Sequence, residues 1–491
     1  MKLYNSKITT HIFSNLDKEN KDIITQINWK SIKSFQYKEN ILNLAKNLSS
    51  FWLNTESKVA ILVKNNINFS NIIISSILVW TTIVLLDPSM WKKILIEKIK
   101  SSKITHLFLE GILYDYLFLT KSEVLNLDLQ IIIDWFSVFW FKKQKLRKLL
   151  NVNNTEVIFK DNDENKDCVI VFTGGTTWNP KWVIHSLFSI YQTLEKIRYF
   201  CKDTKVFYAD MPHFLLLWLL TNSKVISWAY NIKPNVLKKI IEKFSIDTYF
   251  SPPYKYNYFI ENNIKIPKVL NNILLWSAPI YKWFLKKIDN LLDENQRITC
   301  IYGMTEILPI SYIDWREKLK IDIEWDLLWY ILSDINHKII KNELHVKWPH
   351  QLKWYLWYEL NSYVQTWDLV KIIDDKLVMI WRKKDMIIKK EYNIYPSIFE
   401  PIISQIPWIL ASSMIWIYDE NLNDEKIILF LELTNGYIYN KKDIISFLCW
   451  EYMIDKYALP DDIIFMKLPT IWRQNKIDKN KLRRWYIEKI N

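Results

Sequence analysis

A run of hydroxyl and glycine residues follows an apolar stretch in the first half of the chain. The stretch is Val169–Phe172, and the polar run after it consists of Thr173, Gly174, Gly175, Thr176 and Thr177, with Lys181 a few positions further on. Glycines let backbone N–H groups approach phosphate oxygens, threonine hydroxyls donate further hydrogen bonds, and a lysine ammonium neutralises negative charge. The Walker sequence G-x-x-x-x-G-K-[ST] is absent. The pattern therefore predicts a phosphate-binding loop of another kind, in preference to an ordinary polar turn.

The composition holds one anomaly, since the 491 residues include 25 Trp and only 5 Gly. Average usage would give about 34 Gly in a chain of this length. Some bacteria read the UGA codon as Gly, and a translation that reads UGA as Trp would write Trp there. Trp stands beside turn residues at positions 178, 182, 367 and 408, where a positive φ would suit Gly and disfavour a bulky side chain. We predict that many Trp letters stand for Gly. A genuinely Trp-rich protein is the alternative, and the codons distinguish the two.

With Trp178 and Trp182 read as Gly, the loop resembles the signature (Thr/Ser)-x-Gly-Thr-Thr-Gly-x-Pro-Lys-Gly of the acyl-adenylate-forming superfamily. That superfamily includes acyl-CoA synthetases, nonribosomal-peptide adenylation domains and luciferases. Further along, a Tyr-Gly-Met-Thr-Glu segment resembles the family motif Tyr-Gly-x-Thr-Glu. The resemblance implies that Tyr302 stacks on adenine, that Thr305 contacts phosphate, and that Glu306 holds Mg²⁺.

Three further segments resemble family motifs in the family order. Ser277 and Ala278 lie in Trp-Ser-Ala-Pro, which resembles the Gly-x-Ala-Pro loop beside the adenine and the acyl group. Asp368 lies in Thr-Trp-Asp-Leu, which resembles Thr-Gly-Asp-Leu, and the resemblance implies that it binds the ribose hydroxyls. Arg382 and Lys384 lie in Trp-Arg-Lys-Lys-Asp, which resembles Gly-Arg-x-(Lys/Asp)-Asp. The resemblance implies that Arg382 faces the nucleotide and that Lys384 is the hinge about which a small domain turns.

Near the C-terminus, the sequence around Lys476 resembles the Gly-Lys-Ile-(Asp)-Arg tail motif, whose lysine bridges the substrate carboxylate and the α-phosphate. A cation there stabilises the charge that develops as the carboxylate attacks phosphorus. No general base is needed, because a carboxylic acid is already ionised at neutral pH. We predict that Lys476 is catalytic, together with Thr305 and Glu306.

Four positions depart from or only partly keep the family pattern. Glu391 and Asn475 stand where the family usually has Gly, and recoding does not explain them, since neither is Trp. In the family, the loop around this position lines the thiol tunnel. A charged side chain at Glu391 is therefore expected to disfavour the thioester-forming step. Ile398 replaces a common Glu, whereas Glu400 keeps the second acidic residue of that stretch.

The resemblance implies an ATP-dependent ligase that uses Mg²⁺, adenylates a carboxylic acid and then passes the acyl group to coenzyme A. An enzyme that loads a carrier-protein pantetheine, and a non-catalytic nucleotide-binding relative, are the alternatives. By analogy the acyl pocket draws on Met211–Trp218, Trp276–Ile280 and Tyr302–Ile310, which are mainly apolar, so the acid is expected to be hydrophobic or aromatic. Asp210 precedes the first stretch and could instead hold an amino group, as in amino-acid-activating relatives.

Apolar runs alternate with helical patterns through the first part of the chain, as Val59–Val63 and Ile83–Leu86 do with Glu39–Phe51. That rhythm indicates βα units and parallel sheets. Short strands with close turn signals at about 320–380 indicate a small antiparallel sheet or barrel. We predict an α/β fold with a large domain of doubly wound sheets plus a small β-barrel at 1–381, and a mobile α+β lid at 382–491.

The remaining composition narrows the class of protein. The net charge of +13 is spread along the chain, and no segment interleaves basic and aromatic residues as a nucleic-acid module does. The longest apolar run, Ile72–Leu86, is shorter than the roughly 20 residues that a membrane span needs. The four cysteines form no C-x-x-C pair, so neither a disulfide framework nor a zinc site is expected. We predict a cytoplasmic protein with no nucleic-acid partner and no membrane span.

Overall fold

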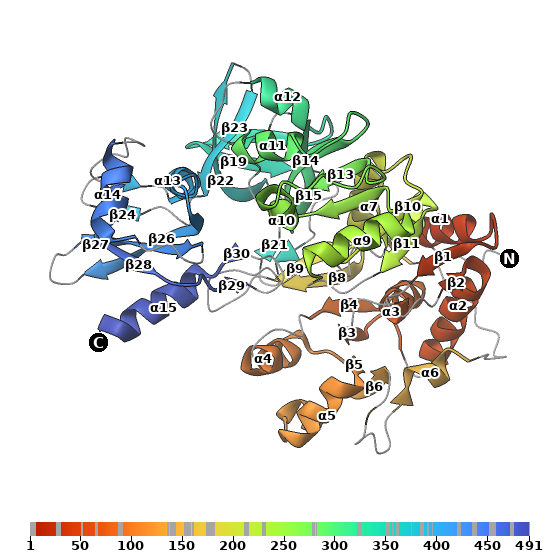
Figure 1. Cartoon of the computed structure of the whole chain (residues 1–491). Coiled ribbons are helices and arrows are strands. Elements are labelled where there is room, and N and C mark those ends of the chain that lie inside the picture. The colour runs from red at the N-terminus through yellow and green to blue at the C-terminus, as the bar shows by residue number, and fades with distance from the viewer. Residues whose placement is uncertain are drawn as a thin grey trace. The chain divides into compact units, whose positions relative to one another are not determined.

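The computed structural model describes most of the chain (Figure 1). The described residues are 6–25, 31–50, 53–63, 67–86, 92–134, 137, 144–151, 159, 162–172, 182–210, 216–227, 232–276, 280, 282–321, 326–328, 330–348, 354–355, 358–359, 363–374, 376–382, 387–389, 392–394, 396–419, 424–434, 439–450, 458–471 and 476–490. They form two compact units. The first comprises Met1–Ala278, Leu285–Arg316 and Trp348–Ser362, and the second comprises Pro279–Phe284, Glu317–Lys347 and Tyr363–Asn491. The domain boundary that the sequence predicts at 381/382 stays a prediction.

One sheet of the first unit has the strand order β21-β20-β9-β8-β4-β3-β5-β6-β7. Its strands are β3 (Lys58–Leu62), β4 (Thr82–Leu85), β5 (His106–Glu110), β6 (Gln130–Asp134), β7 (Gln144–Lys145), β8 (Asp167–Phe172), β9 (Trp182–Ser186), β20 (Trp354–Tyr355) and β21 (Tyr358–Glu359). The strands from β8 to β7 in this order are parallel, and β9 turns back antiparallel to β8. The crossover helices are α3 (Ile67–Leu78), α4 (Lys92–Ser102) and α5 (Gly111–Leu119).

The strands of this sheet are buried on both faces, as the apolar runs of the sequence require. Val59 and Ile61 of β3 join the core that contains α3, whereas Ala60 and Leu62 join the core that contains α4 and α5. The helices therefore cover opposite faces of the sheet (Figure 1), which confirms the doubly wound α/β prediction. The apolar run Ile72–Leu86 comprises the end of the buried helix α3 and the strand β4 that follows it.

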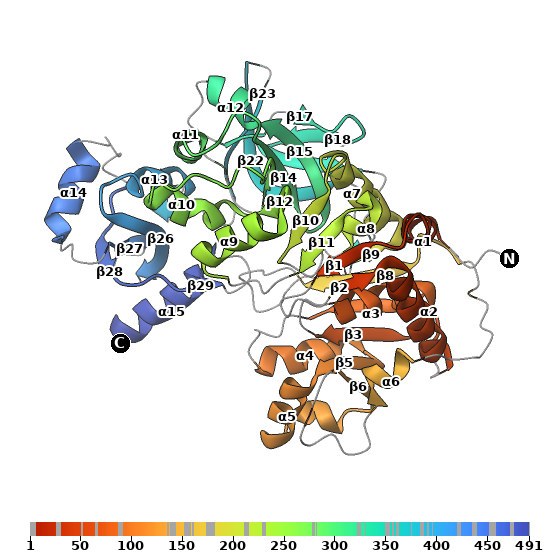
Figure 2. The ribbon, with the colours of Figure 1, turned by 45° about the vertical axis from the view of Figure 1, so that its right-hand side comes forward.

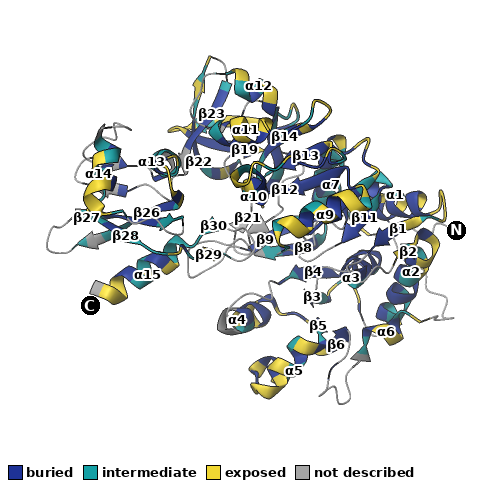
Figure 3. Cartoon of the chain, in the orientation of Figure 1, coloured by how far each residue is buried: buried dark blue, intermediate teal, exposed yellow. Residues whose placement is uncertain are grey.

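In the second sheet of the first unit, neighbouring strands follow the order β15-β14-β13-β12-β10-β11-β1-β2. These strands are β1 (Asp22–Thr25), β2 (Ser31–Lys33), β10 (Val206–Ala209), β11 (Lys224–Ser227), β12 (Thr248–Ser251), β13 (Asn272–Leu275), β14 (Arg297–Met304) and β15 (Ile307–Asp314). Strands β10 to β14 are parallel, and β14 turns back into β15. Helices of the unit include α1 (Lys7–Leu16), α2 (Ser34–Ser50), α7 (Leu187–Tyr199), α8 (Leu217–Thr221), α9 (Pro234–Phe244) and α10 (Asn257–Glu261). Figure 3 shows buried strands and exposed residues on the outer sides of helices such as α5 and α9.

The second unit holds an antiparallel sheet of order β16-β23-β22-β19-β18, in the place where the sequence predicts a small antiparallel sheet or barrel. Its strands are β16 (Asp326–Leu327), β18 (Asn336–Ile340), β19 (Glu343–Lys347), β22 (Val364–Ile373) and β23 (Lys376–Arg382). The C-terminal part follows with β24 (Ile387–Lys389), β25 (Tyr392–Ile394), α13 (Pro396–Ile403), β26 (Ile409–Asp419), β27 (Asp424–Leu433), α14 (Lys441–Trp450), β28 (Asp462–Phe465), β29 (Thr470–Ile471), β30 (Lys476–Ile477) and α15 (Lys479–Ile490).

The sheet β26-β27-β28 carries helices on its two faces (Figure 2). Leu429 packs with the core on the side of α13 and α14, whereas its neighbour Phe430 packs with Leu482 and Tyr486 of α15. This alternation follows from the two-residue period of a strand. The C-terminal α+β prediction is confirmed. Among the described residues, no helix has the length and apolar character to cross a membrane.

Candidate active site

The hairpin of β8 and β9 brackets the predicted phosphate loop. Phe172 and Trp182 form the last pair before the connecting loop of the hairpin, so the loop begins and ends at the carboxyl end of β8. In open α/β sheets, ligands bind outside the carboxyl ends of the strands. The loop residues Thr173, Gly174, Gly175, Thr176, Thr177 and Lys181 lie outside the described residues, and their roles stay predictions.

The second motif forms the turn between β14 and β15. Met304 pairs with Ile307, so Thr305 and Glu306 are the two residues of the hairpin loop. Tyr302 is half-buried near the end of β14. Thr305 is exposed, whereas Glu306 is buried. The structure therefore places the predicted aromatic, hydroxyl and carboxylate groups together at the carboxyl end of a parallel strand.

A histidine that the sequence did not single out connects this turn to the phosphate-loop hairpin. His185 of β9 donates from Nε2 to the backbone oxygen of Thr305 at 2.9 Å, and its Nδ1 lies 3.2 Å from Ser189 Oγ. The two partners are 120 positions apart, so no local pattern could have indicated the contact. The register of β9 indicates only that His185 and Val183 share a face.

The same turn leaves no room for a side chain at position 303. A Cβ on Gly303 would lie 2.6 Å from Leu308 Cδ1, 3.1 Å from the Ile307 backbone oxygen and 3.3 Å from Leu308 Cα. The Leu308 side chain can rotate away, but the backbone atoms cannot. The motif glycine therefore allows close packing of the hairpin, and any larger residue at position 303 would force its neighbours to shift.

We expect Gly303→Ala to lower the free energy of unfolding by about 1–3 kcal/mol, the usual cost of overpacking, and to raise the KM for ATP. Chemical denaturation and steady-state kinetics measure the two effects. A Leu308→Ala background should recover part of the lost stability, because it removes the nearest clashing atom. An unchanged denaturation midpoint for Gly303→Ala would contradict the packing argument.

The predicted adenine-side loop begins where β13 ends. Trp276 directly follows β13, and its indole stacks on Phe250 of β12, with ring centroids 5.0 Å apart and planes at 29°. Ser277 and Ala278 lie outside the described residues. The structure thus fixes the strand that carries this loop, and the roles of the two residues stay predictions.

Asp210, at the end of β10, already has partners. Its Oδ2 accepts from Lys255 Nζ at 3.1 Å and from the Tyr249 hydroxyl at 2.7 Å, and both carboxyl and ammonium are buried. Burial raises the pKa of Asp210 above its ordinary value, and the Lys255 charge opposes that rise. The lysine therefore neutralises the carboxylate that could have held the amino group of an amino-acid substrate.

In the second unit, Asp368 lies on β22 and is 1% exposed. Its backbone N–H donates to Thr366 Oγ1 at 3.1 Å, and that hydroxyl donates to the Leu344 backbone oxygen at 2.8 Å. Asp368 is also the cross-strand partner of Arg382 on β23. The structure therefore brings together two residues that the sequence assigns to the nucleotide from separate motifs.

Lys476 lies on a short hairpin, where it pairs with Ile471 of β29. Three residues later, at Lys479, α15 begins, and the Lys481 backbone N–H donates to Asp478 Oδ1 at 3.0 Å at the start of that helix. Glu400 Oε1 accepts from Lys479 Nζ at 2.9 Å and from the Met414 backbone N–H at 2.7 Å. Glu400 thus ties α13, β26 and α15 together, and α15 begins three residues after the predicted catalytic lysine. Lys384, Glu391 and Asn475 lie outside the described residues.

The residues present suit Mg²⁺ as a partner of a bound nucleotide. Within the described part of the chain, no group of three or more His, Cys, Asp and Glu could hold a metal ion. Mg²⁺ usually keeps several waters and binds through one or two carboxylates plus substrate phosphates. A single carboxylate, Glu306, in the turn that His185 links to the β8–β9 hairpin, fits that mode.

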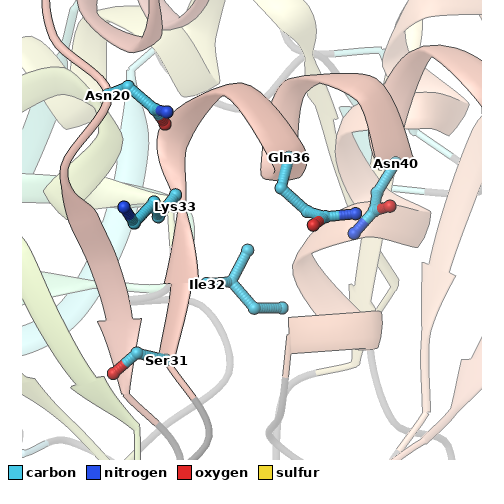
Figure 4. Close-up of a pocket in the computed structure, with 6 residues that line it drawn as sticks. All are labelled: Asn20, Ser31, Ile32, Lys33, Gln36 and Asn40. Atoms are coloured by element: carbon cyan, nitrogen blue, oxygen red, sulfur yellow. The ribbon is translucent and has the colours of Figure 1, made fainter.

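A cavity of about 380 Å³ lies elsewhere in the first unit, at the start of α2. It is lined by Asn20, Ser31, Ile32, Lys33, Gln36 and Asn40 (Figure 4). Gln36 and Asn40 project into it from α2. None of these residues belongs to a predicted site motif.

Comparison with known proteins defines the class to which this fold and site belong. Residues 17–328 match the model of the AMP-binding enzyme family, and the chain belongs to that family. Its relatives include the 2-succinylbenzoate–CoA ligase of Staphylococcus aureus (strain MRSA252), 26% identical over 64% of this chain and 66% of that protein. Another is the putative acyl–CoA ligase YdaB of Bacillus subtilis (strain 168), 24% identical over 67% of this chain and 69% of that protein. The aligned part thus spans about two thirds of these relatives' length.

Solved structures share the fold over nearly the whole chain. The o-succinylbenzoate CoA synthetase of Bacillus subtilis in complex with the acyl-adenylate intermediate OSB-AMP has a TM-score of 0.80 at 15% identity, covering 96% of this chain and 97% of that one. ATP-bound MatB from Rhodopseudomonas palustris has a TM-score of 0.82 at 15% identity, covering 98% and 99%. The resemblance to the acyl-adenylate-forming superfamily and the fold class that it implied are confirmed.

Proposed function

We propose that the protein is an AMP-forming acid–thiol ligase. In the first step a carboxylate oxygen of the acid attacks the α-phosphorus of ATP, and the bond to the bridging oxygen breaks to release pyrophosphate. In the second step a thiol attacks the acyl carbon, AMP leaves, and the thiol proton goes to solvent. Family membership supports this reaction class, and the relatives named above are CoA ligases by name.

The observation that supports the first step most directly is the link between two predicted nucleotide-binding segments. The β8–β9 hairpin, which brackets the phosphate loop, is hydrogen-bonded through His185 to the turn that holds Thr305 and Glu306. In the proposed site the loop and Lys181 hold phosphate oxygens, and Glu306 orients the phosphates through Mg²⁺. Tyr302 stacks on adenine, and Ser277 and Ala278 line the base.

Residues of the second unit carry further proposed roles. Asp368 accepts hydrogen bonds from the ribose hydroxyls, and Arg382, its cross-strand partner, faces the nucleotide. Lys476 stabilises the negative charge that develops between the carboxylate and the α-phosphate. The segment 382–491 acts as a lid that turns about Lys384 between the two steps.

Coenzyme A is the proposed acceptor, since the relatives are CoA ligases by name. A carrier-protein pantetheine is the second candidate, and Glu391, which stands where the family usually has Gly in the loop that lines the thiol tunnel, is expected to affect transfer to the thiol. The proposed acid is hydrophobic or aromatic, as the apolar stretches of the predicted acyl pocket suggest. The name of 2-succinylbenzoate, the substrate of the first relative, also denotes an aromatic acid. The proposed location is the cytoplasm.

The test is acid-dependent exchange of pyrophosphate into ATP, followed by acyl-CoA detection after addition of CoA. A panel of aromatic, fatty and dicarboxylic acids serves as substrate. We expect exchange with at least one aromatic or apolar acid, and acyl-CoA only when CoA is present. Exchange without acyl-CoA would redirect the second step to a carrier protein, and absence of exchange with every acid would overturn the ligase proposal.

We further propose that Trp80, Trp367 and Trp408 stand for Gly. Their φ angles are 62°, 61° and 72°, in the left-handed region where an L-residue pays about 1–2 kcal/mol and Gly does not. Two of the three, Trp367 and Trp408, are positions that the sequence singled out as turns. The exchange test should therefore be run on the chain with UGA read as Gly and on the chain with Trp at every such position.

A further inference from the structure

We infer that His185 is a positioning residue for the adenylation step, which fixes the peptide group between Thr305 and Glu306 and thereby aims the Glu306 carboxylate. This inference rests on the ligase proposal above. It concerns a residue that lies in none of the motifs that carry the family resemblance.

The geometry leaves one assignment for the donor. The Thr305 backbone oxygen can only accept, so the hydrogen bond at 2.9 Å must be donated by His185 Nε2. Burial lowers the pKa of His185 to about 4, so the ring is neutral at pH 7 and Nδ1 is an acceptor. Ser189 Oγ lies 3.2 Å from Nδ1, but its single proton is donated to the Ser186 backbone oxygen, so the Thr305 carbonyl is the group that fixes the tautomer with its proton on Nε2.

The elements that carry His185 and Ser189 hold the imidazole ring in place. Ser186 caps the start of α7, where its Oγ accepts from the Ser189 backbone N–H at 3.1 Å, and Ser189 Oγ lies 3.1 Å from the Ser186 backbone oxygen. Val183, next to His185 on the same face of β9, is fully buried. A strand and a helix N-terminus thus fix the ring that holds the turn.

The hydrogen bond from His185 acts on the peptide group that precedes the proposed Mg²⁺ ligand, Glu306. The Thr305 carbonyl and the Glu306 N–H belong to one planar peptide group, so a hydrogen bond to the first sets the orientation of the second. Because β14 and β9 belong to different sheets, this bond also sets the spacing between the turn and the phosphate-loop hairpin. Hydrogen-bond partners that orient metal ligands typically contribute about 10–100-fold in metal affinity or activity.

The variants are His185→Leu, which keeps bulk but removes the donor, and His185→Gln, whose amide can donate from a similar place. His11→Leu is the matched control, since His11 is also half-buried in the first unit, with its Nδ1 3.2 Å from Glu195 Oε1 and 3.3 Å from Tyr191 Oη. The measurements are the Mg²⁺ concentration that gives half-maximal exchange, kcat and KM for ATP, and the shift in Tm on adding MgATP.

We expect His185→Leu to lower kcat or raise the Mg²⁺ requirement by about 10–100-fold, and to reduce the Tm shift caused by MgATP. His185→Gln should recover most of both. His11→Leu should lower Tm without ligand by a similar amount and leave the Mg²⁺ dependence unchanged. Equal Mg²⁺ dependence and equal kcat in the wild type, His185→Leu and His11→Leu would overturn the inference. A wild type that binds MgATP but shows no exchange would overturn the ligase proposal instead, and the Tm shifts would still test His185.

Discussion

Replacing Lys476 with Gln is expected to lower the rate of acid-dependent pyrophosphate exchange by about 10²–10³-fold, the usual effect of removing one group that stabilises transition-state charge. The KM for ATP should change little, because the proposed adenine, ribose and phosphate contacts come from other residues. The reason is electrostatic. Negative charge develops between the attacking carboxylate and the α-phosphate, and the Lys476 ammonium is the cation proposed to stabilise that charge.

Lys481→Gln provides the matched control for Lys476→Gln. Lys481 is exposed on α15, five positions further along, so the substitution removes the same charge from the same part of the chain. The control should keep wild-type exchange. The CoA step should be tested separately by supplying preformed acyl-AMP, and Lys476→Gln is expected to retain it. If Lys476→Gln and Lys481→Gln lowered the exchange rate equally, the effect would come from the change in net charge, and Lys476 would not be the catalytic lysine.

Trp367→Gly and Trp408→Gly, made in the chain with Trp at every such position, are each expected to raise the free energy of unfolding by about 1–2 kcal/mol. Both residues have positive φ. Trp408 is 46% exposed, and Trp367 is half-buried, so replacing them sacrifices little buried apolar surface. Against a total stability of about 5–15 kcal/mol, the two changes together are large. Urea denaturation measures each variant.

Trp315→Gly is the control with the opposite expected sign. Trp315 is fully buried, and its Nε1 donates to Asp289 Oδ1 at 2.7 Å. Removing it should destabilise the protein by about 3–5 kcal/mol, the usual cost of deleting a large core side chain. The codons give a direct reading of the same proposal. We expect UGA at positions 80, 367 and 408, and UGG at position 315. UGG codons at positions 80, 367 and 408 would contradict the proposal that these Trp letters stand for Gly.

The sequence by itself determined the elements and the family. The strands β3 and β4 lie within one residue of the apolar runs Val59–Val63 and Ile83–Leu86 that predict them, because a buried parallel strand consists of a short, nearly continuous apolar run. Val169–Phe172 is likewise found within β8, which begins two residues earlier at Asp167. The motifs could be located because a phosphate loop or a ribose-binding turn uses contiguous residues whose types are set by local chemistry.

Only the tertiary structure decided which of these segments meet. The bond from His185 to Thr305 and the pairing of Asp368 with Arg382 join residues from separate stretches, and strand order and register create such pairs. The structure also gave Asp210 a buried lysine partner, which no spacing along the chain could indicate. Positive φ angles distinguish Trp80, Trp367 and Trp408, whose backbone conformation suits Gly, from Trp315, whose side chain is fully buried in the core. Local residue types set local conformation, whereas the packing of sheets and helices sets which polar groups come within hydrogen-bonding distance.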